Sequence, residues 1–351
     1  MQNIWYKVLL LITIVAIILI FNQCGDDTNK YYKGTKLENI EYIKSKNIGL
    51  PSQILIIGNN LLLIDDKPLY GSGKIKIFNL KTNKEISIGF DGSGPGEFIQ
   101  PNSLNKVIGS ENAFTINDLT LFRVTKYSIK QNKIVMNNLY RLKGGMPIQT
   151  VLLNDGRIIA LGFGLTKGRI AVYDTAGTII DEIGQIPKHS SKNVPTPIVL
   201  QAYDGQLRVK PDGKIYVISA QYSDRIDIYT NKGKLVKKII GPINSVPQYS
   251  ISKVGKFPVM TLDVENTIYG YIDIFAGNKF IYALFSGRKF KEHKFQGHFV
   301  HVYDYAGRYI KTYVLKEGIS SFSVDEVNNC IYGLQYYPQI RVLKFKLNNK
   351  L

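Results

Sequence analysis

Short segments in which apolar and polar residues alternate recur along most of the chain. Each ends in an aromatic residue and a turn, as in Arg169–Gly177, Arg225–Gly233 and Phe299–Gly307, with looser copies at 74–82, 124–129 and 340–345. Alternation with a period of two is typical of half-buried β-strands. The aromatic anchors are Phe78, Tyr127, Tyr173, Tyr229, Tyr303 and Phe345, at intervals of 42 to 74 residues. Six such repeats, most of them close to the ~40 to 50 residues of a propeller blade, predict a six-bladed β-propeller.

A second hairpin precedes most of these anchors. Its turn is clearest at Leu153–Arg157 and Lys210–Lys214, where Asn, Asp or Gly stands between two alternating runs, and similar turns are expected at 58–60, 277–279 and 327–329. Asn and Gly tolerate the positive φ angles that tight hairpins require. Two hairpins per repeat predict four strands per blade. The predicted fold class is therefore all-β: a six-bladed β-propeller of four-stranded antiparallel blades, preceded by an N-terminal signal or anchor segment.

The sixth repeat ends at Leu351 and leaves no residues for a fourth strand. The alternating segment Leu37–Lys44 precedes the first complete repeat, and we expect it to close the ring as the outer strand of the last blade, because a bare sheet edge would otherwise remain. The predicted domains are a signal peptide at 1–23, a polar tether at 24–36 that contributes no strand, and a propeller at 37–351. Two stretches, 186–203 and 242–269, interrupt the repeat as insertions.

The amino terminus carries an export signal. An unbroken apolar run from Val8 to Phe21 follows Lys7 and ends three residues before Cys24. The run is shorter than the ~20 residues of a transmembrane helix and matches the ~7 to 15 residues of a secretory signal core. We expect Cys24 to be lipidated as the first mature residue, which predicts an outer-membrane lipoprotein of the cell envelope, facing either the periplasm or the surface. The alternative is an uncleaved anchor helix with an unmodified cysteine.

The chain is strongly basic, with a formal net charge of +18. Such a surface favours anionic partners, but the lysines are scattered and no run of them forms a patch, so we interpret the charge as a general property of the surface. Nucleic acid is not expected as a partner, because the signal peptide directs the chain out of the cytoplasm. The second cysteine, Cys330, lies in an apolar run and predicts a buried thiol without a disulfide.

Two segments resemble the NHL-repeat six-bladed propellers. Residues 210–241 contain Pro-Asp-Gly-Lys-Ile-Tyr-Val and a matching third strand, and residues 89–101 contain Gly-Ser-Gly-Pro-Gly-Glu-Phe, which resembles the loop that joins successive blades in lipoproteins of the Bacteroidota. The residues of this blade-connecting loop are Gly92, Gly94, Pro95, Gly96, Glu97 and Phe98. Asp26 and Asp27, just after Cys24, resemble the export signal of surface lipoproteins in that group. The resemblance implies a fold and a location but no activity, since propellers host many functions.

We interpret the loop as structural: Gly94 and Gly96 would adopt unusual backbone angles, and Phe98 would fill the space between blades. The loops between second and third strands, and those between blades, gather on one face of such a ring, where ligands usually bind. The residues expected on this face are Tyr222, Asp224, Arg225, Arg169, Tyr336 and Tyr337. Exposed aromatic and guanidinium groups suit glycan or peptide binding, although Arg225 could equally pair with Asp224.

The search for catalytic motifs gives almost nothing. Three of the four histidines fall at 293, 298 and 301, but His298 and His301 would point to opposite faces of a strand, so no metal site, cofactor or catalytic residue is predicted. We expect a monomeric, non-catalytic binding protein for a peptide, glycan or protein partner. The alternative is a metal-dependent hydrolase or lyase whose site is assembled from several blades at the channel mouth, where local motifs could not reveal it.

Overall fold

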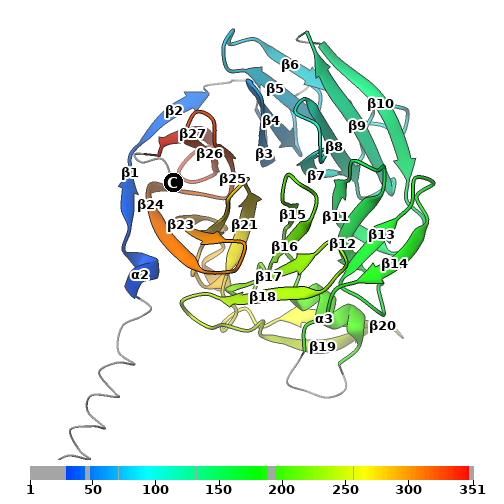
Figure 1. Ribbon diagram of the computed structural model, residues 1–351, viewed down its shortest axis with the longest axis vertical. Helices are drawn as coiled ribbons and strands as arrows, with labels where there is room; N and C mark the ends of the chain where they lie inside the picture. Colours follow the sequence, from blue (N-terminus) through cyan, green and yellow to red (C-terminus); the bar gives the residue numbers. More distant parts are fainter. Residues whose placement is uncertain are drawn as a thin grey trace, which may run out of the picture.

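The computed structural model of the protein describes residues 29–43, 48–69, 71–131, 133–188, 194–255 and 257–347. These residues form a ring of six blades around a central channel (Figure 1), which confirms the predicted all-β propeller. The predicted signal peptide at 1–23, together with Cys24, Asp26 and Asp27, lies outside the described residues. Within the described ranges, no helix has the length and apolar character needed to cross a membrane.

Within each blade, consecutive strands pair antiparallel and follow one another from the channel outward. Blades one to three contain β3 (Pro51–Ile57), β4 (Asn60–Asp65), β5 (Ile75–Asn79) and β6 (Glu85–Ile88); β7 (Pro101–Lys106), β8 (Ala113–Asp118), β9 (Arg123–Lys130) and β10 (Lys133–Arg141); and β11 (Met146–Leu152), β12 (Ile158–Phe163), β13 (Ile170–Tyr173) and β14 (Ile179–Ile183). Blades four to six contain β15 (Leu207–Val209), β16 (Ile215–Ser219), β17 (Arg225–Thr230) and β18 (Leu235–Ile240); β21 (Tyr271–Ala276), β22 (Phe280–Phe285), β23 (Gly297–Asp304) and β24 (Tyr309–Ile319); and β25 (Ser321–Asp325), β26 (Cys330–Gln335) and β27 (Arg341–Lys346).

The aromatic anchors of the repeat hold neighbouring blades together. All six lie on third strands, and none is more than 8 % exposed. Each packs against the preceding blade: Tyr229 of blade four, for example, joins the core of blade three with Ile170 and Val172. Its hydroxyl donates to the carbonyl of Gln185, in the connection between these blades, at 3.1 Å. An aromatic residue suits this position because it buries a large apolar face and can still donate a hydrogen bond at its tip.

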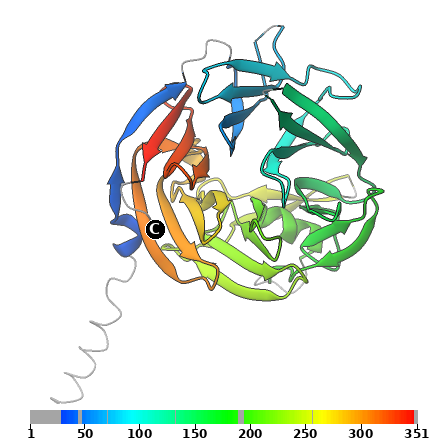
Figure 2. The same ribbon diagram turned by 45° about the horizontal axis from the view of Figure 1, so that its top comes forward.

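The ring closes through β2 (Asn39–Ile43), the outer strand of blade six. β2 pairs antiparallel with β27, placing Asn39 opposite Phe345 and Ile43 opposite Val342. The closing strand expected at Leu37–Lys44 pairs with the last blade as predicted over residues 39–43, but Leu37 belongs to another strand and pairs with blade five. Because β2 precedes blade one and β27 is the last described strand, the pairing joins both ends of the propeller (Figure 2).

The expected tether at 24–36 is wrong for residues 29–36. These residues form α2 (Asn29–Tyr32) and the start of β1 (Thr35–Leu37), which pairs in parallel with β24 as a fifth strand of blade five. Leu37 is only 1 % exposed. The polar composition concealed this packing, since a few apolar and aromatic side chains are enough to carry it. We call residues 29–43 the amino-terminal strap, because they bind blades five and six in succession.

A buried histidine fastens the strap to blade five. His301 Nε2 lies 3.0 Å from the carbonyl oxygen of Tyr31, and Nδ1 lies 2.9 Å from the hydroxyl of Tyr271, which in turn lies 2.7 Å from that of Tyr303. A carbonyl can only accept, so Nε2 carries the proton and Nδ1 accepts from Tyr271. Burial lowers the pKa of His301 to about 3, and the hydrogen bond to Tyr31 opposes this shift only in part. The imidazole is therefore neutral at physiological pH.

The insertions lie outside the blades. The first contains α3 (Thr196–Ala202), and the second forms a separate hairpin of β19 (Tyr249–Val254) and β20 (Phe257–Leu262). Val199 and Ala202 of α3 are buried, and Met260 of the hairpin packs against the same cluster. A one-turn helix, η1 (Phe290–Glu292), lies in the loop between β22 and β23 of blade five.

Candidate functional site

The loop at 92–98 braces blades one and two. Phe98 is fully buried in a core that both blades share. Gly92 and Gly96 have φ angles of 150° and 78°, so these two glycines, and not the predicted pair Gly94 and Gly96, adopt positive φ. Gly94 has another role: its N–H donates to the Glu97 carboxylate at 2.8 Å, and a Cβ there would lie 2.9 Å from the same oxygen.

Arg123, which no sequence motif singled out, fixes this loop through hydrogen bonds to its backbone. Its guanidinium donates to the carbonyls of Ser93 at 3.0 Å and Gly94 at 3.1 Å, and to that of Glu97. The guanidinium carbon also lies 5.8 Å from the centre of the Phe98 ring. Since Arg123 is only 1 % exposed, the arginine and the loop form a closed unit, which supports the structural interpretation.

Three residues expected on the ligand face are instead buried between blades. Arg169 and Arg225 both pair with the buried carboxylate of Asp227, the latter at 2.8 Å from Nε. Asp224 accepts hydrogen bonds from the backbone N–H groups of Ile243 and, at the same distance of 2.7 Å, Ser245. Of the two alternatives for Arg225, ion pairing is therefore observed, but with Asp227 and not with Asp224.

The three expected tyrosines have different surroundings. Tyr222 packs edge-on against Phe290, with ring centres 5.9 Å apart. Tyr336 donates its hydroxyl to the carbonyl of Pro51, across the boundary between blades six and one. Tyr337 is exposed over 54 % of its surface. The structure thus brings Arg169 and Arg225 together through Asp227, but it does not assemble the six residues into one surface.

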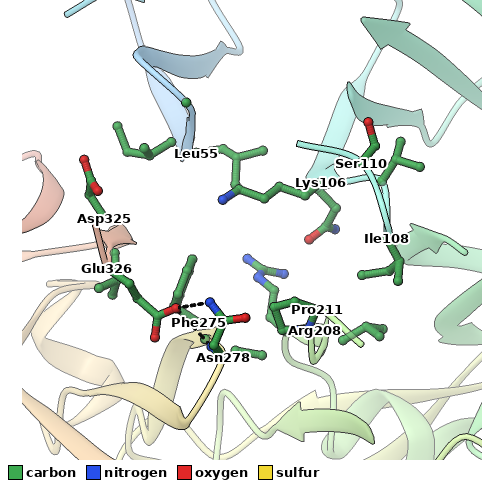
Figure 3. A pocket seen from close by; sticks show the side chains of 18 of the residues that line it. Leu55, Lys106, Ile108, Ser110, Arg208, Pro211, Phe275, Asn278, Asp325 and Glu326 are labelled. Atoms are coloured by element: carbon green, nitrogen blue, oxygen red, sulfur yellow. Dashed lines mark hydrogen bonds between the residues drawn. The ribbon is translucent and has the colours of Figure 1, made fainter. Parts of the chain in front are cut away.

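A cavity of about 360 Å³ lies on the channel axis, at the end of the ring opposite to that face. Inner strands run from the blade connections toward the turns of the first hairpins, and the cavity is formed where these strands end (Figure 3). All six blades contribute to it, through Leu55, Lys106, Val151, Arg208, Phe275 and Asp325 on the inner strands. We call this cavity the axial pocket.

Two cationic side chains reach into the axial pocket from blades two and four. Lys106, the last residue of β7, extends into the cavity, and Arg208 of β15 approaches it from the channel (Figure 3). Burial lowers the pKa of Lys106, while the carboxylates of Asp325 and Glu326 oppose that shift. Lys106 is therefore a partly desolvated lysine, and an anionic partner would stabilise its charged form.

Two acidic side chains line the facing wall on blade six. Asp325 caps its own turn by accepting the N–H groups of Val327 at 3.1 Å and Asn328 at 2.9 Å. Glu326 accepts both the backbone N–H, at 3.0 Å, and the side-chain amide, at 2.8 Å, of Asn278 on blade five. These bonds fix the carboxylates at the mouth of the pocket, on the side away from Ile108.

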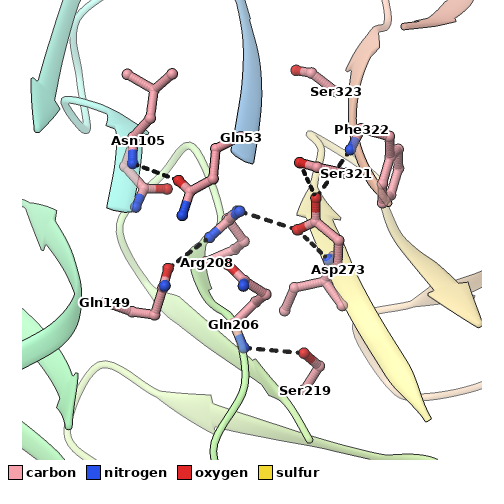
Figure 4. A network of polar contacts seen from close by, with 12 residues as sticks. Gln53, Asn105, Gln149, Gln206, Arg208, Ser219, Asp273, Ser321, Phe322 and Ser323 are labelled. Carbon is pink, nitrogen blue, oxygen red and sulfur yellow. Dashed lines mark hydrogen bonds and ion pairs between the residues drawn. The ribbon is translucent and has the colours of Figure 1, made fainter. Parts of the chain in front are cut away.

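A polar network closes the pocket toward the channel (Figure 4). The Arg208 guanidinium lies 3.1 Å from Asp273 and 3.5 Å from Gln149, so three inner strands meet at one side chain. Asp273 also accepts the hydroxyl of Ser321 at 2.8 Å. Burial raises the pKa of Asp273, and Arg208 opposes that shift. The network holds Arg208 in one orientation, with one side facing the cavity.

Part of this site could have been found in the sequence. The turns at 58–60, 277–279 and 327–329 were recognised as hairpin turns, and they supply the rim of the pocket. Lys106 and Arg208 carried no signal, because they lie on different blades and meet only at the axis. His301 is buried and lies near the carbonyl of Tyr31, whereas His298 is half-buried and lies near the carbonyl of Leu315. Among the described residues, no three His, Cys, Asp or Glu side chains are grouped to hold a metal ion.

The fold and the pocket define a six-bladed propeller with a small-molecule-sized cavity on its axis. The chain belongs to the TolB-like 6-blade propeller-like family, which matches residues 32–327. This match supports the six-bladed propeller implied by the sequence resemblance, and it names the TolB-like family where the loop and turn motifs resembled NHL repeats. No curated protein matches the chain by sequence.

Several solved structures share the fold. A Bacteroides fragilis protein described as exported has 14 % identity and a TM-score of 0.50, over 89 % of this chain and 95 % of that one. Streptogramin B lyase has 14 % identity and a TM-score of 0.51, over 89 % of this chain and 98 % of that one. Chaetomium thermophilum Raptor has 13 % identity and a TM-score of 0.50, over 93 % of this chain and 30 % of that one. At such identities the similarity shows the fold alone.

Proposed function

We propose that the protein is an exported lipoprotein of the cell envelope. Its propeller binds a small ligand in the axial pocket and does not catalyse a reaction of that ligand. One observation carries the binding proposal: all six blades converge on a cavity of about 360 Å³. Small-ligand sites have volumes of roughly 300 to 1,000 Å³ and combine apolar walls with a few charged groups. The axial pocket has this composition, with Leu55, Val151 and Ile108 beside its four charged side chains.

The lining favours a peptide over a glycan or a large protein surface. Glycan sites typically present several aromatic faces to the sugar rings, whereas Phe275 is the one aromatic side chain among the described residues that line the pocket. Charges of both signs face the cavity, from Lys106 and Arg208 on one wall and from Asp325 and Glu326 on another. Peptide termini and side chains offer both signs as well.

The proposal of an envelope location rests on the amino terminus. The apolar run that ends before Cys24 has the length of a signal core, and the similarity to the exported Bacteroides fragilis protein is consistent with it. Residues 25–28 separate Cys24 from α2, so a lipid on Cys24 would hold the propeller close to the membrane surface. The partners proposed are therefore the membrane, through this lipid, and a small peptide.

A ligand screen with a blocked pocket tests the binding proposal. Full-length protein in dodecyl maltoside micelles is denatured thermally in the presence of dipeptides, tripeptides and oligosaccharides. A ligand at 100 times its Kd stabilises the folded state by about 2.7 kcal/mol. Ser110→Trp places an indole on the rim of the pocket, and Ser252→Trp, on the exposed β19 hairpin, is the matched control.

We expect a peptide to raise the melting temperature of the wild type and of Ser252→Trp, and to leave that of Ser110→Trp unchanged. The proposal fails if no compound in the screen has an effect, or if a compound that binds the wild type stabilises Ser110→Trp equally. Hydrolysis or elimination of a bound compound, detected by mass spectrometry, would overturn the assignment of a non-catalytic role.

A further inference from the structure

The charges of the axial pocket come from different blades. Lys106 enters from blade two and Arg208 from blade four, whereas Asp325 and Glu326 stand together on blade six (Figure 3). Blade six lies between blades five and one, so the acidic wall is across the ring from the two cations. A ligand that fills the cavity therefore meets positive charge from blades two and four and negative charge from blade six.

The side-chain ammonium of Lys106 makes no hydrogen bond or ion pair within the described part of the chain. The residue is half-buried, and a charge in such a place is costly without a partner. An ammonium that projects into a cavity is a point-charge binder for carboxylate or phosphate. The apolar residues Leu55 and Ile108 leave it few other partners.

Arg208 is held in an orientation in which it can help Lys106 to bind an anionic group. Its guanidinium donates to Asp273 at 3.1 Å, to the carbonyl of Leu207 at 3.0 Å and weakly to Gln149 at 3.5 Å. A guanidinium has five N–H donors, so two remain for a ligand. Because Asp273 balances its charge, Arg208 adds direction to the site, while Lys106 supplies a positive charge that has no ion pair among the described residues.

The acidic wall suits an ammonium. The Oε2 atom of Glu326 accepts both N–H groups of Asn278, and Oε1 accepts none of the hydrogen bonds seen among the described residues. Gly277 allows this arrangement, since a Cβ at that position would lie 2.1 Å from Oε1. Asp325 adds a second negative charge beside it. A ligand with a single negative charge would be repelled from this wall, so the pocket favours a zwitterion.

We infer that the axial pocket selects short peptides with free termini, binding the terminal carboxylate at Lys106 and Arg208 and the terminal ammonium at Glu326. This inference rests on the proposed binding function and specifies its ligand. The apolar wall, with Leu55, Val151 and Phe275 among its residues, receives the side chains. The volume of the cavity limits the ligand to a few residues.

Isothermal titration calorimetry with chemically matched dipeptides tests the inference. The probes are alanyl-leucine, its carboxyl-terminal amide and its N-acetyl form, titrated into full-length protein in dodecyl maltoside micelles. A hydrogen bond to a charged group changes the dissociation constant by about ten-fold or more. We therefore expect the amide and the N-acetyl form each to bind at least ten-fold more weakly than alanyl-leucine.

Two lysine variants locate the carboxylate. Lys106→Met keeps the length of the side chain and removes its charge, and the control Lys67→Met removes one charge from an exposed loop on the opposite face. In Lys106→Met the preference for the acid over the amide should become clearly smaller, because only Arg208 remains, while the penalty for N-acetylation persists. Lys67→Met should retain the full preference for the acid.

The inference is overturned if alanyl-leucine does not bind, or if the wild type binds the amide as tightly as the acid. Neither comparison depends on a variant, so a failure of Lys106→Met to fold would not obscure the result. If another ligand class binds the wild type and is blocked in Ser110→Trp, the peptide inference fails and the proposed function stands. If nothing binds, or Ser110→Trp blocks nothing, the proposed function fails.

Discussion

The amino-terminal strap gives a sharp test of how the ring is held together. Leu37 and Ile40 lie three residues apart in it, but Leu37 is 1 % exposed and Ile40 is 61 % exposed. Leu37 packs into the core of blades five and six, together with Tyr313 and Leu343. Truncation of both side chains to alanine compares a buried with an exposed position in one short segment.

Truncation of the buried Leu37 should destabilise the protein much more than truncation of the exposed Ile40. Removal of a buried leucine side chain destabilises a protein by about 2 to 5 kcal/mol, through lost transfer free energy and the cavity that remains. The Ile40→Ala change should cost about 0.5 to 1 kcal/mol, because alanine has the lower β-propensity but little buried area is lost. For a domain of this size, 1 kcal/mol corresponds to about 1.5 °C in melting temperature.

We therefore expect Leu37→Ala to lower the melting temperature by about 3 to 7 °C and Ile40→Ala by about 1 °C. Circular dichroism of the full-length protein in micelles measures both. The unfolding transition of Leu37→Ala should remain single, because the strap joins two blades and its loss weakens the closed ring as a whole. Equal shifts for the two variants, or a shift below about 1 °C for Leu37→Ala, would refute the packing of β1 on blade five.

Two further predictions concern the buried His301 of blade five and the lipid expected on Cys24. His301 has a folded-state pKa of about 3, below the ~6.5 of an unfolded histidine, so the unfolded chain binds more protons and stability should fall as pH drops from about 6.5 toward 3. In urea denaturation at several pH values, His301→Gln should weaken this dependence, and an unchanged pH profile would contradict the assignment. Cys24→Ala should abolish labelling by an alkyne fatty acid and release the protein from membranes; absence of label in the wild type would favour the anchor-helix alternative.

The fold was largely predictable because its signals are local. The alternating strands, the Asn and Gly turns and the aromatic anchors each occupy a few consecutive residues, and they recur six times. Even the closing strand could be placed, since the last repeat lacked an outer strand. The packing of residues 29–36 was missed, because α2 and β1 are too short and polar to show a period.

The site was less predictable, because its residues are distant in sequence. Arg169 and Arg225 were expected to face a ligand, and nothing local indicated that Asp227 would neutralise both within the blades. Lys106 and Arg208 are separated by about a hundred residues. They line the same pocket because both lie on inner strands, which all face the axis of the ring. Strand order predicts which positions point to the axis, but which blade supplies which charge follows only from the assembled structure.

The route of the strap has a mechanical consequence. Any tension that reaches the propeller from its amino end passes through α2, β1 and β2 before it reaches blade one. β1 and β2 lie along the edges of two different sheets, so a pull along their length loads several hydrogen bonds at once in shear and divides the force between blades five and six. A protein attached to a membrane by its amino end could thus bear a pulling force there while the axial pocket keeps its shape.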